Sequence, residues 1–503
     1  MSAHYPALLV IIPLLASFFI SAAGWLRPPW CFPLALTAMG GSLLVSIGLL
    51  ADVIRGIPDL YWFGGWAPPW GIYYRVDHLN ALVLVVISGV GFVNLWAARP
   101  TVDRELPEKA GAFYTLYVLF VTGLLGMVVT GDAFNLYVLL EIAAITGYAL
   151  IALGKGRAPL ASLNYIFMGT IGACFYLLGV GYLYIVTGSL NMQDIARLLA
   201  PLHGSRVVTV AFVIMMVGVW LKMGFFPLHA WLPNAYTYAP SPVSSLVAPL
   251  MTKVMVYVMI RMVMTVFTVD YAFGVLVLNE AVVWLAVIAI VAGSLMALAE
   301  KDFKRMLTFI VVAEVGYMVG GFWLGNRSGF TGSVLHIVND ALMTLCLFLA
   351  AGSIIHARGE SRIQSLQGLF STMPWTMGAL VVGAMSIIGV PPTCGFFSKW
   401  YLLLGAVEGG HYGFLAALLF SSLVNVVLFF RIFEIGYFEP MEASHGGASH
   451  GHAHGHEAPA MSEAPLGMLV PLWMTALGLI AVGFYTGEIV GRVIRHAIPA
   501  TMF

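Results

Sequence analysis

Ionisable side chains interrupt long apolar stretches of this sequence, and their types suit proton transfer. A charge at the centre of a bilayer costs at least about 2.5–3.5 kcal/mol on the insertion scale, so such a residue by default marks an ion or proton path. The alternative is a packed polar pair, or a side chain that reaches the membrane surface. The six residues that we predict to carry protons are Glu141, Lys222, Lys253, His336, Asp340 and Lys399.

Three of the seven lysines stand inside apolar runs, whereas lysines kept only for solubility belong in loops. Lys222 comes just before Pro227, and Lys399 follows Pro391 and Pro392, so a broken helix is expected beside each of these lysines. Lys253 would carry the proton between Lys222 and Lys399. Burial disfavours the ammonium form of a lysine, so a buried lysine can load and release a proton.

The acidic and histidine positions add partners for these lysines. Glu141 has no basic neighbour within four residues, so its partner must come from another helix. A pair with Lys222 would hold a proton on the lysine when the carboxylate is close and release it when the carboxylate withdraws. His336 and Asp340 are four residues apart and share one helix face, where they would relay protons or hydrogen-bond each other.

Three other ionisable residues have weaker cases. His229, just past Pro227, would gate the break or cap a helix end. Glu314 follows a basic loop and would make a lateral polar contact. Glu280 stands near a helix end, from which its carboxylate would extend to the membrane surface.

The composition is that of an integral membrane protein. The 503 residues are 60% hydrophobic and 9% charged, against about 25% charged in a soluble domain. Because the net charge is zero, the composition does not indicate a basic surface for binding nucleic acid. A span needs about 20 mostly apolar residues, and this rule predicts an all-α, polytopic protein with about 14 transmembrane helices. The expected spans are 5–25, 31–51, 78–98, 112–130, 133–153, 162–187, 207–225, 242–267, 274–299, 306–325, 329–356, 374–408 (broken), 411–435 and 466–490.

The layout also predicts two inverted repeats of five helices, each with one broken helix that carries a lysine. A unit with an odd number of helices must insert with opposite topology when it is repeated. The predicted parts are N-terminal helices 1–3 (1–111), a first repeat (112–267), a second repeat (268–438), a His-rich loop (439–465) and a C-terminal helix (466–503).

Loop charges predict the orientation. With the N-terminus outside, the inner loops collect about 12 Lys and Arg and the outer loops about 8, which fits the positive-inside rule. We therefore expect a multi-pass protein of the cell inner (plasma) membrane with both termini outside. The N-terminus lacks the basic start of a cleaved signal peptide, so the first apolar run is expected to stay as a transmembrane helix.

Cofactor and metal motifs are missing from the sequence. The four cysteines are too widely spaced for a zinc site or an iron–sulfur cluster, and there is no P-loop or dinucleotide glycine motif. Any redox or nucleotide driving force would come from a partner. Five of the 13 histidines lie in 445–456, where they would bind a metal loosely or, more simply, belong to a solvated linker. We expect neither a cofactor nor a resident metal.

Several of these motifs resemble those of the antiporter-like membrane subunits of respiratory complex I, membrane-bound hydrogenases and Mrp-type cation/proton antiporters. The resemblance covers roughly residues 75–440, and 134–141 with 187–196 look most like the Mrp D subunit. The stretches that carry it are Phe134–Tyr137 before Glu141 (fifth-helix motif), Lys222–Pro233 (seventh), Asp302–Arg305 (entering the tenth) and Gly389–Lys399 (twelfth).

This resemblance implies a proton-translocating subunit of a multisubunit sodium/proton antiporter, with other hydrophobic subunits as partners. The alternative is a pumping subunit of a redox-driven complex, similar to NADH:quinone oxidoreductase or a membrane-bound hydrogenase. The three buried lysines argue against an inactive scaffold. One helix departs from the family pattern: many members have a second histidine and then a lysine where this chain has Asp340 and Thr344, so the central link between half-channels is altered. The lateral helix of some members is not expected.

Overall fold

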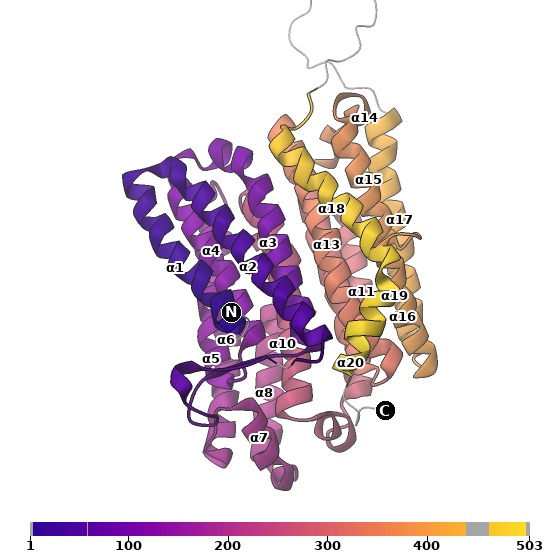
Figure 1. Cartoon of the computed structure of the whole chain (residues 1–503). Helices are drawn as coiled ribbons and strands as arrows, with labels where there is room; N and C mark the ends of the chain where they lie inside the picture. Colours follow the sequence, from indigo (N-terminus) through magenta and orange to yellow (C-terminus); the bar gives the residue numbers. More distant parts are fainter. Residues whose placement is uncertain (1–3, 58, 439–461, 499–503) are drawn as a thin grey trace, which may run out of the picture.

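The computed structural model describes residues 4–57, 59–438 and 462–498, and long apolar helices dominate them. Thirteen described helices are long and apolar enough to cross a membrane. They stand side by side along one direction (Figure 1). A further crossing consists of two 15-residue helices, α15 (Pro374–Ile388) and α16 (Cys394–Glu408), placed end to end. These 13 helices and the broken pair confirm the predicted polytopic α-helical fold with about 14 spans.

The N-terminal part has three helices and a hairpin. The helices are α1 (Tyr5–Leu26), α2 (Cys31–Ile54) and α3 (His78–Glu105), with β1 (Asp59–Trp62) and β2 (Tyr73–Val76) paired antiparallel before α3. Asp77 caps α3 by accepting hydrogen bonds from the amides of Leu79 and Asn80, so the long helix starts where the hairpin ends.

The middle of the chain contains the first broken helix. Its helices are α4 (Ala110–Val129), α5 (Ala133–Ala152), α6 (Ala158–Thr187), α7 (Met192–Leu199), α8 (Arg206–Met223), α9 (Leu232–Tyr238) and α10 (Ser241–Arg261). Gly224 ends α8 with φ +68°, a value that favours glycine. The short α9 after Pro227 is the predicted second half of that helix.

The second half of the bundle repeats the plan. Its helices are α11 (Asn279–Ala299), α12 (Phe303–Trp323), α13 (Arg327–Arg358), α14 (Leu369–Thr372), α15 (Pro374–Ile388), α16 (Cys394–Glu408) and α17 (Tyr412–Phe438). Two short π-helical segments, Met262–Val266 and Asp270–Val275, precede α11. Because Val277 takes φ +50° after them, α11 begins five residues later than the predicted span 274–299.

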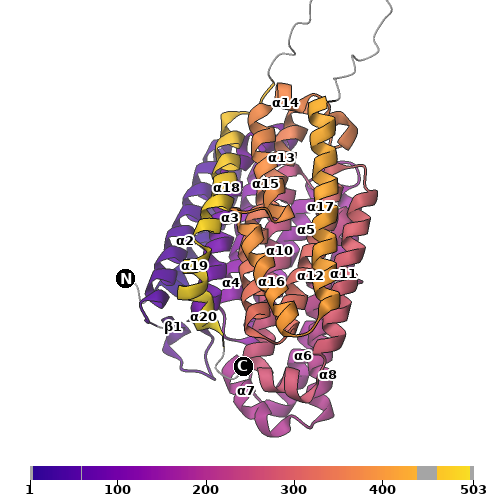
Figure 2. The ribbon, with the colours of Figure 1, turned by 90° about the vertical axis from the view of Figure 1, so that its right-hand side faces the viewer.

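The C-terminal part returns along the outside of the bundle as α18 (Leu466–Phe484), α19 (Thr486–Ile489) and α20 (Arg495–Ala497) (Figure 2). Its end comes back to the N-terminal part, since the ring of His496 stacks on that of His78, with 5.0 Å between centroids. The ring of His4 touches Tyr61 of β1, with 5.7 Å between centroids. Both described ends therefore lie near the β1–β2 hairpin, at what we call the hairpin end.

Two matching joints relate the halves of the bundle. Before α5, the amide of Ala133 donates to the carbonyl of Leu190 (2.8 Å), and that of Met192 donates to Gly131 (3.0 Å). Before α12, the amide of Phe303 donates to Ser361 (2.7 Å), and that of Ile363 donates to Lys301 (2.9 Å). Each helix is capped by an aspartate, Asp132 for α5 and Asp302 for α12.

The two joints lie at opposite ends of the bundle. Thr130 bridges to Tyr74 of β2, so the first joint is at the hairpin end. Ser361 and Lys304, at the second joint, line a cavity with Glu105, the last residue of α3. We call this second end, with Lys155, Lys301 and Arg362 in its loops, the basic end. The opposite placement is what an inverted repeat requires, while the boundaries 112–267 and 268–438 stay predictions.

Candidate functional site

Lys222 and Glu141 form the first polar pair inside the bundle. Lys222 lies in the last turn of α8 and is fully buried, and its Nζ is 3.5 Å from Glu141 Oε1 on α5. The ammonium also donates to the hydroxyl of Tyr148, 3.3 Å away and two turns further along α5. The partner that Glu141 required from another helix is therefore Lys222.

The break after α8 holds this lysine in place. Helix termination at Gly224 leaves the last carbonyls of α8 without amide partners from a next turn. The carbonyl of Leu221 accepts from the amide of Gly224 at 3.2 Å and also from the indole of Trp231 at 3.0 Å. Lys222 thus sits on a helix end that is fixed by the returning chain.

Lys253 on α10 and Asp340 on α13 form the second pair. The distance from Lys253 Nζ to Asp340 Oδ2 is 2.8 Å, and both side chains are almost completely buried. Thr344 completes the group, because its hydroxyl donates to Asp340 Oδ1 at 2.8 Å and lies 3.4 Å from the ammonium. The carbonyl of Ala248 accepts from the ammonium at 3.2 Å. Asp340 therefore neutralises Lys253 at the position where the sequence departs from the family pattern.

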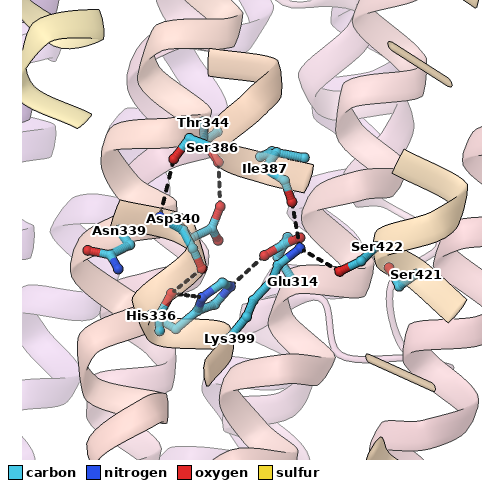
Figure 3. A network of polar contacts seen from close by, with 12 residues as sticks. Glu314, His336, Asn339, Asp340, Thr344, Ser386, Ile387, Lys399, Ser421 and Ser422 are labelled. Carbon is cyan, nitrogen blue, oxygen red and sulfur yellow. Dashed lines mark hydrogen bonds and ion pairs between the residues drawn. The ribbon is translucent and has the colours of Figure 1, made fainter. Parts of the chain in front are cut away.

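His336 has a different partner from the one considered in the sequence. Its Nε2 lies 2.5 Å from Glu314 Oε2 on α12, and its Nδ1 lies 2.9 Å from the hydroxyl of Ser398 on α16. Within the described residues, no hydrogen bond joins the His336 ring to the Asp340 carboxylate, although both lie on one face of α13. Figure 3 shows the two side chains directed to separate partners.

Lys399 lies in α16 just past the second break. Its ammonium donates to the carbonyl of Ile387, at the end of α15, at 2.5 Å, and to the hydroxyl of Ser422 at 3.1 Å. The ammonium is 5.2 Å from the ring centre of Tyr317, a cation–π distance. The break supplies the main partner, because a continuous helix would use the Ile387 carbonyl for its own ladder.

Glu314 is the functional candidate that sequence reasoning underrated. Expected to make a lateral polar contact, it is completely buried against His336. One feature of the sequence indicated it: both glutamates follow an aspartate that caps their helix. Glu141 comes nine residues after Asp132. Glu314 comes twelve residues after Asp302, about one helical turn deeper. The ion-pair partner of Glu141 is a lysine, whereas that of Glu314 is a histidine.

The other weak candidates stay apart from these pairs. The ring of His229 stacks on that of Phe226 with 5.0 Å between centroids. This contact does not distinguish a gating role from a helix-capping role for His229. Glu280 is exposed in the first turn of α11 and accepts from the indole of Trp284 at 3.1 Å, as expected for a carboxylate near the membrane surface. The histidines of 445–456 lie outside the described residues.

A further ion pair, between Asp77 and Arg261 at the hairpin end, was not anticipated. The guanidinium contacts both carboxylate oxygens, at 2.7 and 2.9 Å, and its Nε donates to the hydroxyl of Tyr257 at 2.9 Å. Burial alone would raise the pKa of the Asp77 carboxyl, but the Arg261 guanidinium lowers this pKa to about 2. Because Asp77 precedes α3 and Arg261 ends α10, the pair fastens these two helices together.

The fold and these buried pairs define a polytopic membrane subunit with ionisable groups along its interior. The chain matches the family model described as NADH:quinone oxidoreductase/Mrp antiporter, TM, over residues 130–425. It belongs to this family of antiporter-like membrane subunits.

Relatives in this family come from two kinds of complex. The chain is 42% identical to the N subunit of NADH-quinone oxidoreductase from Desulforudis audaxviator (strain MP104C), with 99% of each chain covered. It is 33% identical to the D subunit of the Na(+)/H(+) antiporter from Alkalihalophilus pseudofirmus, with 79% of each covered.

Solved structures give the same picture. A chain of the membrane-bound sulfane sulfur reductase, an archaeal respiratory membrane complex, superposes with a TM-score of 0.88 at 29% identity, covering 98% of this chain and 97% of that one. A chain of the Mrp complex from Dietzia sp. DQ12-45-1b gives a TM-score of 0.88 at 23% identity, covering 100% and 98%, which supports the fold alone.

Proposed function

We propose that this chain moves protons across the membrane as one subunit of a multisubunit complex. The residues assigned to proton transfer are Glu141, Lys222, Lys253, His336, Asp340 and Lys399. One observation carries the proposal: Lys222, Lys253 and Lys399 are buried within the helices, and each has a different polar partner. These partners are a partly exposed carboxylate, a buried carboxylate and a freed carbonyl, respectively.

This set of partners makes the lysines unequal as proton carriers. Lys222 and Lys253 each lie against a carboxylate, whereas Lys399 has only neutral partners within hydrogen-bonding distance. Moving a carboxylate away would favour proton release from its lysine. The distance from Glu141 to Lys222 is 3.5 Å, longer than the 2.8 Å of the buried pair, so this pair is the easier one to open.

The complex is either a sodium/proton antiporter of Mrp type or a redox-driven pump. The Alkalihalophilus pseudofirmus relative, named as a Na(+)/H(+) antiporter component, supports the first proposal, in which Na⁺ moves against protons. The full-length, 42% identical relative named as a component of NADH-quinone oxidoreductase supports the second. In both, hydrophobic membrane subunits are the neighbours, and both chain ends lie outside the plasma membrane.

Glu141→Gln tests the proton path. It removes the charge that holds the proton on Lys222 and should slow proton translocation by the purified complex in vesicles at least tenfold. Glu280→Gln, at an exposed carboxylate near a helix end, is the matched control and should keep the parental rate. Parental translocation by Glu141→Gln would contradict the proposed role of this pair.

Mild detergent purification of the tagged protein, followed by mass spectrometry, separates the two complexes. Small hydrophobic subunits alone, together with sodium-dependent proton movement, would support the Mrp-type assignment. Flavin, iron–sulfur or hydrogenase subunits would support the redox-driven pump.

A further inference from the structure

A cavity of about 450 Å³ opens at the basic end, where the two halves of the bundle meet α3. It lies beside the α9–α10 turn, which closes the first broken helix. Its charged and titratable lining residues are Arg104, Glu105, Lys155, Lys304, His356 and Glu360, and Thr237 and Ser241 also line it.

Two charged groups tie the cavity wall to the start of α10. Glu105 Oε2 accepts from the amide of Ser241 at 2.9 Å, so a carboxylate caps the first turn of α10. The ammonium of Lys304, only 5% exposed, donates to the carbonyl of Ala239 at 2.6 Å. Glu105 comes from α3 and Lys304 from α12, so both repeats and the N-terminal part contribute to this wall.

A stripe of hydroxyl groups leads inward from the cavity. Ser241, Ser245 and Thr252 lie on one face of α10, at spacings of four and seven residues. We call these three residues the hydroxyl stripe. Pro249 lacks an amide hydrogen, so the carbonyl of Ser245 receives no ladder bond from it. The buried hydroxyl of Thr252, next to Lys253, has no hydrogen-bond partner among the described residues.

Asn94 of α3 supports this stripe from the side. Its amide nitrogen donates to the hydroxyl of Ser245 at 2.7 Å, and its oxygen accepts from the hydroxyl of Tyr117 at 3.0 Å. Glu105 places a carboxylate on the cavity wall at the outer end of the stripe. From Glu105, the hydroxyl oxygens of the stripe would provide successive proton acceptors toward the Lys253–Asp340 pair.

We propose that this cavity is the proton entrance of the basic end, with Glu105 as the group that receives the proton and the hydroxyl stripe as its route to Lys253. Lys304 is a positioning residue that holds the α9–α10 turn against α12. This inference rests on the proposed proton translocation. It adds the side of the membrane from which protons enter and the residues that take them up.

Thiol labelling tests whether the cavity is open. In a Cys174→Ser background, Thr237→Cys should react with a membrane-impermeant, charged methanethiosulfonate reagent only from the side of the basic end. Ser88→Cys, buried within α3, should stay unlabelled from both sides. No labelling of Thr237→Cys from either side, or labelling from the hairpin side, would overturn the entrance.

The pH dependence of transport tests Glu105. Glu105→Gln keeps an oxygen that can cap α10 but removes the group that collects protons. We expect near-parental translocation with a pH of about 6 at the basic end and a loss of at least fivefold at a pH of about 8, where protons are scarce. Glu108→Gln, an exposed carboxylate three residues away, should follow the parent at both pH values. An unchanged profile for Glu105→Gln would refute its role.

The two proposals fail in distinguishable ways. If Lys222→Ala translocates normally, the proposed function fails whatever the labelling result is. If Lys222 is essential but Thr237→Cys stays unlabelled or Glu105→Gln keeps the parental profile, only the entrance is wrong.

Discussion

The ammonium of Lys253 lies 2.8 Å from Oδ2 of Asp340, and this ion pair joins α10 of one predicted repeat to α13 of the other. The two side chains are 2% and 0% exposed, so neither charge has water to replace its partner. Removing one member of a buried pair leaves an uncompensated charge, which costs about 3–5 kcal/mol, whereas replacing both by apolar groups is often neutral. Stability and transport can therefore be separated at this pair.

Asp340→Leu should destabilise the assembled complex and stop proton translocation, because it leaves the Lys253 ammonium buried without a counter-charge. The double variant Lys253→Met with Asp340→Leu should recover thermal stability while translocation stays lost. Unfolding temperature and vesicle acidification measure the two properties. Lys301→Met removes an exposed lysine and should change neither. A double variant that pumps at the parental rate would show that this pair is only structural.

Glu314 and His336 should act as one unit, because their side chains are hydrogen-bonded and have no exposure to solvent. Glu314→Gln and His336→Gln should each reduce translocation at least tenfold. The double variant should be no slower than the worse single one, since effects within a shared network do not add. Initial rates in vesicles give this comparison. Multiplicative losses in the double variant would mean that the two residues work independently.

Gly224→Ala should slow transport because Gly224 ends α8 with φ +68°, only two residues after Lys222. An alanine there costs about 1–2 kcal/mol in backbone strain, and its Cβ would come within 2.6 Å of Leu232 Cδ1. Gly188→Ala is a matched control, since φ is +67° and the space around that Cβ is open. Both variants should lose similar stability from strain, and only Gly224→Ala should transport slowly. Equal transport losses would show that strain alone is responsible.

The Asp77–Arg261 pair should make stability depend on pH in acid. The pKa of Asp77 is about 2 in the folded protein and about 3.9 for an unfolded aspartate. A lowered pKa stabilises the fold above the unfolded value, and this contribution fades as pH falls toward 2. Asp77→Asn should thus lower the unfolding temperature at pH 7 and differ less from the parent at pH 3. Asp52→Asn, beside the exposed Arg55, should show no such change. A difference independent of pH would contradict this assignment.

The sequence predicted the membrane fold and the burial of Lys222, Lys253 and Lys399 because both depend on local composition. Long apolar runs define spans, and a lysine or a proline within one is visible without knowledge of the packing. The partner of Glu141 followed from the absence of a basic neighbour. This prediction was confirmed in the contact with Lys222.

The pairing inside the second half was not predictable in the same way. His336 and Asp340 are neighbours on one helix, but other helices decide their partners, and Glu314 and Lys253 come from α12 and α10. The ion pair of Asp77 with Arg261 joins residues 184 positions apart, so no local pattern indicates it. Spacing places side chains on a helix face, while tertiary packing decides which helices that face meets.

The most direct test of the proton path is the rate of proton translocation by the complex carrying Lys222→Arg, compared with Lys222→Ala and the parent. Arginine keeps the positive charge beside Glu141 but does not release its proton, so it can replace lysine as an ion-pair partner and not as a proton carrier. The proposed path predicts that both variants assemble and that neither translocates protons. Translocation restored to the parental rate by arginine would contradict it.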